Sequence, residues 1–234
     1  MITGPAVPST PAQHGRRDRI LETATAMLSA GGEDALQMKE LSQRAGVSLA
    51  TVYRYFPAKD HVLLAITLSR YERALARVQA EPAHGGTVRE RVTSHLLREF
   101  RAEQREPLLT AALSRAVSET SRSYSATIER IERLHLRVIR HVAAGGGPLG
   151  TPLSGPLGTP LSGPHDAVLP VVADVFTAAT RRWLAGVSSP AAARFEIRLG
   201  CRLLDLPDEA LDQDALDEEI ALAGSRTATG SPRE

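Results

Sequence analysis

Cysteine is almost absent from this chain of 234 residues, which contains only Cys201. With a single thiol no intrachain disulfide can form, and this agrees with a reducing cytoplasm. No apolar run approaches the length of a membrane span, and the first residues, MITGPAVPSTPAQHG, lack the hydrophobic core of a signal peptide. We therefore expect a cytoplasmic protein that does not cross a membrane, with a Pro-rich, disordered arm over residues 1–15.

The motifs of common enzymes and metal sites are also missing. The seven histidines are scattered without an HxxxH or HExxH pair, and Cys201 has no partner cysteine. Gly145 to Gly147 precede a Pro-rich stretch rather than a helix, so they do not form a phosphate-binding loop. We predict no catalytic residue, no metal ion and no cofactor. An all-helical enzyme is kept as an alternative, and it would need an acid–base pair in a pocket.

Charge is nearly balanced overall, at +1, but it is distributed unevenly along the chain. Residues 36–59 hold four bases and one acid, Glu40, whereas residues 205–219 hold eight acids and no base. This pattern is expected where only the positive segment meets phosphate groups.

The stretch LQMKELSQRAGVSLATVYRYFPAKD, residues 36–60, predicts two short helices joined by a tight turn. Apolar residues spaced by three and four give the first helix, 38–45, one buried face. Gly46 follows where a helix commonly ends in the left-handed conformation, and Ser48 is a suitable N-cap for the second helix, 49–56. This is a helix-turn-helix arrangement, in which the second helix enters the major groove of DNA.

The second of these helices should have one buried and one exposed face. Val52 and Phe56 lie four residues apart and should pack inward. Tyr53 and Arg54 are then free to reach base edges, and the small Ala50 lets the backbone approach the groove, while nearby hydroxyl groups are placed to donate to phosphate oxygens. The predicted DNA contacts are Gln37, Lys39, Ser48, Leu49, Ala50, Thr51, Tyr53, Arg54, Tyr55 and Lys59. The alternative is an ordinary helical hairpin with aromatic side chains at its surface.

The run GVSLATVYRYFPAKDHVLLAI closely resembles the helix-turn-helix of TetR-family transcriptional regulators, with aromatic residues at 53–56, then Lys59, then a long apolar helix. This resemblance covers roughly residues 16–71. Part of it, RYFPAKDHVLLA, also resembles repressors of steroid and cholesterol catabolism, whose effectors are CoA thioesters. The resemblance implies a repressor that binds a palindromic DNA operator as a homodimer and is released by a small hydrophobic effector.

The remainder of the chain predicts further helices and no strand, so we expect an all-α protein of about ten helices. The expected organisation is a helix-turn-helix DNA-binding domain at residues 16–60, a helical effector-binding and dimerisation domain at 61–223, and a disordered tail at 224–234. Residues 145–166 include two copies of PLGTPLSG, and this density of Pro and Gly predicts a flexible loop. The helices are expected at residues 16–30, 38–45, 49–56, 60–78, 88–105, from 107, 126–144, 168–188, 190–206 and 208–223.

The resemblance also implies roles for these later helices. The pair at 168–188 and 190–206 would form a four-helix bundle with a second copy of the chain. The middle helices would enclose an effector pocket with an apolar lining, although each candidate residue taken alone would suit an ordinary core position. The candidates are Leu96, Phe100, Leu113, Ile131, His135, Phe176 and Trp183. A second hypothesis is a helical ligand-binding or scaffold protein whose head docks a protein partner.

Overall fold

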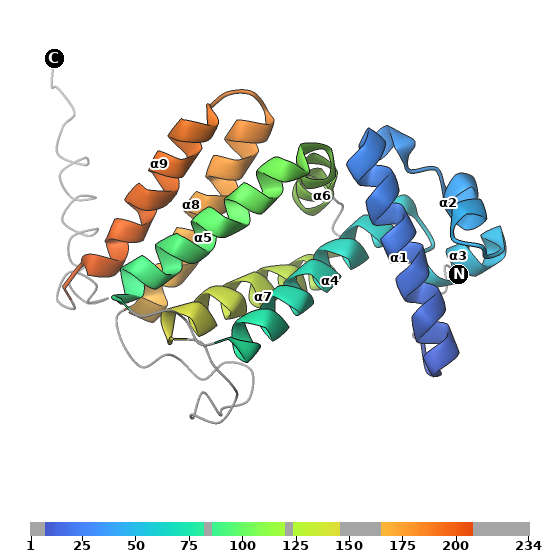
Figure 1. Cartoon of the computed structure of the whole chain (residues 1–234), viewed down its shortest axis with the longest axis horizontal. Coiled ribbons are helices and arrows are strands. Elements are labelled where there is room, and N and C mark those ends of the chain that lie inside the picture. The colour runs from blue at the N-terminus through green and yellow to red at the C-terminus, as the bar shows by residue number, and fades with distance from the viewer. Residues whose placement is uncertain (1–7, 82–85, 120–123, 146–164, 208–234) are drawn as a thin grey trace, which may run out of the picture.

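Every regular element is helical in the part of the chain that the computed structural model describes, residues 8–81, 86–119, 124–145 and 165–207. Three helices form a head, and a long fourth helix leads from it into a bundle of the remaining helices (Figure 1). The predicted all-α class is confirmed. The elements are α1 Pro11–Gly31, η1 Glu33–Ala35, α2 Met38–Arg44, α3 Leu49–Tyr55, α4 Lys59–Ala80, α5 Val88–Arg105, α6 Pro107–Glu119, α7 Ser125–Ala143, α8 His165–Leu184, α9 Pro190–Cys201 and η3 Arg202–Asp205.

The first helix begins earlier than the sequence suggested. Thr10 caps it, accepting a hydrogen bond from the backbone N–H of Gln13, and Pro11 occupies the first turn, where a missing N–H has no cost. Residues 11–15 therefore belong to α1, and their assignment to a disordered arm was wrong. Residues 1–7 of that arm lie outside the described part of the chain.

The predicted turn between α2 and α3 is confirmed. Gly46 has φ of 64°, the left-handed conformation that closes α2 without a Cβ penalty. Ser48 caps α3 and accepts a hydrogen bond from the backbone N–H of Thr51. These two residues fix the angle at which α3 leaves α2.

Helices α4, α5 and α7 agree with their predicted bounds to within two residues. α8 instead begins at His165, inside the predicted loop at 145–166, and ends at Leu184 rather than at 188. α5 spans the predicted residues, and Thr87 and Glu90 form a reciprocal capping box at its start. The predicted helix at 190–206 is instead α9 followed by the 3-10 turn η3. The tandem PLGTPLSG copies, the predicted acidic helix at 208–223 and the predicted tail fall outside the described residues.

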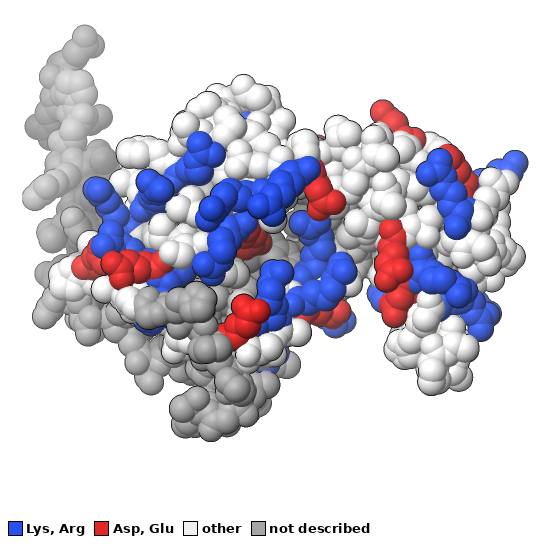
Figure 2. Space-filling view, in the orientation of Figure 1, with Lys and Arg blue, Asp and Glu red and all other residues white. Residues whose placement is uncertain are grey.

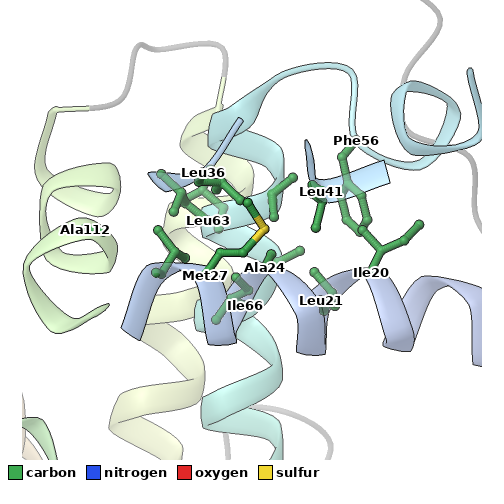
Figure 3. Close-up of a cluster of buried hydrophobic side chains, with 14 of the residues drawn as sticks. Ile20, Leu21, Ala24, Met27, Leu36, Leu41, Phe56, Leu63, Ile66 and Ala112 are labelled. Atoms are coloured by element: carbon green, nitrogen blue, oxygen red, sulfur yellow. The ribbon is translucent and has the colours of Figure 1, made fainter. Parts of the chain in front are cut away.

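One apolar core joins the head to α4 and α6. Ile20, Leu21, Ala24 and Met27 of α1 pack with Leu41, Phe56, Leu63, Ile66 and Ala112, so residues from four helices share this core (Figure 3). Leu63 and Ile66 of α4 are each almost fully buried there, with 0% and 1% of their surface exposed. The packing is therefore continuous across the predicted domain boundary at residue 60, and α4 is part of both the head and the helical bundle.

A second core holds α5, α7, α8 and α9 together. Phe100 and Leu96 of α5 are completely buried in it, and Trp183 packs edge-on against Phe100 with ring centroids 5.3 Å apart. Gly200 allows α9 to approach α8 closely, because a Cβ there would lie 2.8 Å from a methyl group of Val175. Among the described residues, no helix is both long and apolar enough to cross a membrane.

Candidate functional site

Helix α3 presents one buried and one exposed face, as predicted. Val52 and Phe56 are buried, with 0% and 2% of their surface exposed. On the opposite side Tyr53 and Leu49 remain 46% and 38% exposed, and Arg54 is exposed beside them. An exposed Tyr–Arg pair on a helix anchored from behind can contact the edges of bases in a groove.

Tyr55 was wrongly expected to contact phosphate. Its side chain is 3% exposed, and it lies three residues after Val52, so it falls on the same inward face of the helix. Its hydroxyl is buried without a hydrogen-bond partner among the described residues. The guanidinium of Arg54 lies over the ring, 5.2 Å from its centroid, so Tyr55 packs beneath Arg54 and does not present its hydroxyl at the surface.

The other predicted DNA contacts surround α3, with one further exception. Ser48 and Ala50 are exposed at the start of the helix, and the hydroxyl of Thr51 lies 2.8 Å from that of Ser48. Gln37 and Lys39 are exposed at the start of α2, the helix that braces α3. All five are at least partly exposed at the surface of the helix-turn-helix, as a contact with DNA would require.

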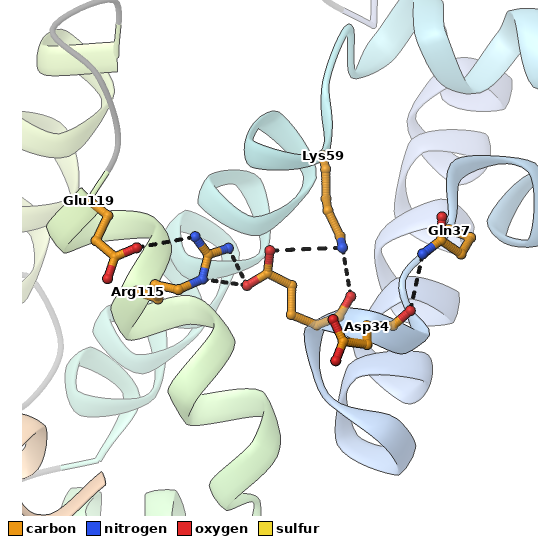
Figure 4. A network of polar contacts seen from close by, with 6 residues as sticks. Asp34, Gln37, Lys59, Arg115 and Glu119 are labelled. Carbon is orange, nitrogen blue, oxygen red and sulfur yellow. Dashed lines mark hydrogen bonds and ion pairs between the residues drawn. The ribbon is translucent and has the colours of Figure 1, made fainter. Parts of the chain in front are cut away.

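Lys59 is the exception, because its ammonium group is already bound within the protein. It donates to the backbone oxygen of Glu33 at 2.6 Å and lies 3.8 Å from the carboxylate of the same residue. Arg115 of α6 also pairs with the Glu33 carboxylate and reaches Glu119 at 3.4 Å (Figure 4). Glu33 therefore ties the head at η1 to both α4 and α6, and Lys59 acts in this tie.

A cavity of about 1550 Å³ opens in the helical body. Its walls come mainly from α4, α5, α6, α7 and α8. α4 and α5 each pack on α7 but scarcely touch each other, which leaves the opening between them. Figure 2 shows basic side chains gathered on both sides of this hollow.

Four of the seven predicted pocket residues line the cavity, namely Leu113, Ile131, His135 and Phe176. The other three, Leu96, Phe100 and Trp183, were misplaced. Leu96 and Phe100 of α5 and Trp183 of α8 pack in the second core and do not line the cavity. Periodicity identifies a buried face but does not say whether that face meets another helix or a void.

The expectation of an apolar lining was also incomplete, because many charged residues line the cavity together with the apolar ones. Arg70 and Arg77 of α4 face Glu99 and Glu103 of α5. Burial raises the pKa of Glu99 to about 7, and burial together with the charge of Glu99 raises that of Glu103 to about 8. Glu99 and Glu103 follow His95 on α5 at successive intervals of four residues, which places all three on one face of the helix. This spacing is the signal in the sequence from which they could have been predicted.

A hydrogen-bonded link connects the cavity wall to the head. Glu106 lines the cavity and accepts a hydrogen bond from Ser29 of α1 at 3.0 Å. Its second carboxylate oxygen lies 3.5 Å from the guanidinium of Arg70 on α4. Within the described residues, no group of three or more His, Cys, Asp or Glu side chains is placed to hold a metal ion.

Comparison with known proteins gives these two sites a context. A model described as "Bacterial regulatory proteins, tetR family" matches residues 20–66, which include α2, α3 and the start of α4. The HTH-type transcriptional repressor KstR of Rhodococcus jostii is 33% identical over 196 residues, covering 84% of this chain and 85% of its own. The similarity therefore extends well beyond the head.

Solved structures agree at the level of the fold. The crystal structure of a TetR transcriptional regulator from Rhodococcus sp. RHA1 matches with a TM-score of 0.68 at 23% identity, covering 82% of this chain and 97% of that one. FadR of Thermus thermophilus, solved with lauroyl-CoA, matches with a TM-score of 0.53 at 21% identity, covering 80% and 92%.

Proposed function

This chain belongs to the TetR family of bacterial regulatory proteins, and from this premise we propose that it is a ligand-responsive repressor that binds a palindromic operator as a homodimer. The observation that carries the proposal is α3, whose Tyr53 and Arg54 are exposed while Val52 and Phe56 anchor it from behind. As a DNA-binding regulator it would act in the cytoplasm. A scaffold role gives no reason for this exposed pair beside the basic residues of α2.

Dimerisation is expected through α8 and α9. Their exposed apolar side chains include Phe195 and Leu199, 65% and 51% exposed and four residues apart on α9, and Val171, 48% exposed on α8. Exposed apolar side chains gathered on one helix pair favour burial against another chain. A two-fold dimer would bring two copies of α3 to half-sites separated by about one helical turn of DNA or a multiple of it.

The cavity suits an effector with an apolar body and an anionic head. Leu113, Ile131 and Phe176 give it an apolar wall. Arg77 and Arg98, exposed at the opening on α4 and α5, have no carboxylate within 4 Å among the described residues, so they are available for phosphate groups. A CoA thioester combines both features, and we propose this chemical class for the effector.

Helix α4 provides the route from effector to operator. Its first turns, around Leu63 and Ile66, are buried in the head core, and later residues such as Arg70 and Arg77 line the cavity. A ligand that prefers a different position of α4 will change the separation of the two heads. To release DNA efficiently its preference between the two states must reach several kcal/mol, on the order of 5 for a complete switch.

The proposal is tested by DNA binding of two matched variants, Tyr53→Ala and Tyr55→Phe. Loss of the exposed Tyr53 should weaken specific binding by about 1–3 kcal/mol and relax sequence preference. Loss of the Tyr55 hydroxyl, which is buried without a partner, should leave DNA affinity unchanged. Equal DNA affinity for wild type and both variants would show that α3 is not the reading helix.

A further inference from the structure

A cluster of buried and half-buried polar groups lines the cavity. His95, Glu99 and Glu103 follow one another every four residues on α5 and therefore share one face of the helix. His135 of α7 faces them, with its Nε2 atom 3.9 Å from a carboxylate oxygen of Glu99. Thr180 of α8 closes the cluster, donating to Glu103 at 3.1 Å.

Two members of this cluster have unused hydrogen-bonding atoms. His135 and His95 are only 7% and 8% exposed, and the Nε2 atom of each is buried without a hydrogen-bond partner among the described residues. The distances from these atoms to Glu99, 3.9 and 3.6 Å, are too long for hydrogen bonds. Buried polar atoms are nearly always paired, so two unpaired atoms in one cavity point to a group that binds there.

The electrostatics of the cluster favour an uncharged group. Burial raises the pKa of both carboxyls to neutral or above, so a large share of Glu99 and Glu103 is protonated and able to donate O–H. Burial also lowers the pKa of His135 to about 4 and keeps its ring neutral. A carboxylate on the ligand would lie beside these two carboxyls and would be repelled by their ionised fraction.

A protonated amine on the ligand would instead be repelled by the arginines of the cavity. Arg77 and Arg98 flank the opening, and Arg70 lies on the same wall of the cavity. A cation would have to pass these charges before reaching the carboxyls. A hydroxyl or ketone oxygen meets neither repulsion and can accept from a protonated carboxyl or from an imidazole N–H.

We propose that His135, His95 and Glu99 bind an uncharged oxygen, a hydroxyl or a ketone, carried at the buried end of the effector. This inference rests on the proposed function, because it assumes that the cavity is the effector site. It divides recognition between the two ends of one ligand, with the arginines on the anionic head and the cluster on the terminal oxygen. The regulator would thereby distinguish an oxygenated chain from a plain hydrocarbon chain of equal length.

The test is calorimetric binding of four CoA thioesters that share a twelve-carbon chain and differ at its far end, which is plain, hydroxylated, amino-substituted or carboxylated. The wild-type protein should bind the hydroxylated chain about tenfold more tightly than the plain one, the gain expected from one or two well-placed hydrogen bonds. The variant His135→Phe should lose that difference and keep its affinity for the plain chain. Because it removes an unpaired buried atom, this variant should fold normally.

His141→Phe is the matched control. His141 lies on the same helix, is also 7% exposed and also has an unpaired Nε2 atom, but it does not line the cavity. This variant should retain the wild-type preference for the hydroxylated chain. Glu99→Gln, which keeps the volume of the side chain, provides a second variant that should reduce the preference.

The outcomes separate this inference from the proposed function. Equal binding of plain and hydroxylated chains, or tighter binding of the amino or carboxylated chain, overturns the oxygen site while the thioester site stands. If no thioester binds, the oxygen site and the thioester class are both refuted. DNA binding by the same preparation then decides separately whether the protein is a regulator.

Discussion

Replacing Glu33 with Ala should loosen the head from the body. The substitution removes the pair with Arg115 on α6 and the 3.8 Å pair with Lys59 on α4. The three side chains are 26%, 40% and 29% exposed, so they are partly screened by solvent. Pairs of this kind contribute up to about 1 kcal/mol each, and we expect a total loss of about 1–2 kcal/mol. For a chain of this size that is a fall in Tm of about 2–8 °C.

The matched control is Glu119→Ala, which removes the 3.4 Å contact to Arg115 within α6 and leaves the tie to the head intact. Thermal unfolding of both variants should be followed at about 50 and 500 mM salt, because screening weakens exposed pairs. The deficit of Glu33→Ala should shrink at high salt, and its operator binding should respond less to the effector. Equal stability and equal effector response in Glu33→Ala and Glu119→Ala would refute this role of Glu33.

Three further predictions follow from the surface, the cavity and its carboxyls. Phe195→Asp places a charge on the exposed apolar face of α9, and sedimentation should show monomers of this variant at concentrations where we expect dimers of the wild type. Arg98→Ala should weaken binding of a CoA thioester and leave binding of an uncharged chain unchanged, as calorimetry would show. The raised pKa values of Glu99 and Glu103 mean that the folded protein holds protons that the unfolded chain has lost, so this effect lowers stability as pH rises. The lowered pKa values of the buried histidines raise stability as pH rises, but only below about pH 6.5. Tm should therefore fall between about pH 6.5 and 8.5, and Glu103→Gln should make that fall smaller.

The head was predictable from sequence because its signals are local. Gly46 and Ser48 act on neighbouring backbone groups, and Val52 and Phe56 share a face at a spacing of four, so each interaction lies within a few residues. The prediction for Tyr55 was wrong because a short helix has a wide buried face, and a side chain at the edge of that face can point either into the core or into solvent. Only the packing of the whole head decides that orientation.

The cavity was less predictable because it depends on contacts between distant segments. His135 and Glu99 are 36 positions apart in the chain and come together only when α5 packs against α7. Leu96 and Phe100 have the same apolar pattern as a pocket lining but fill a core between helices. The tie from Glu33 to Arg115 likewise spans 82 positions and leaves no trace in local periodicity.

Selection of bound sequences from a pool of random DNA duplexes tests the central claim most directly. The wild-type protein should enrich an inverted repeat whose two halves are separated by about one helical turn or a multiple, since a dimer presents two copies of α3. Tyr53→Ala should lose this enrichment. A pool that shows no enriched sequence, or one enriched equally by Tyr53→Ala, would contradict the account.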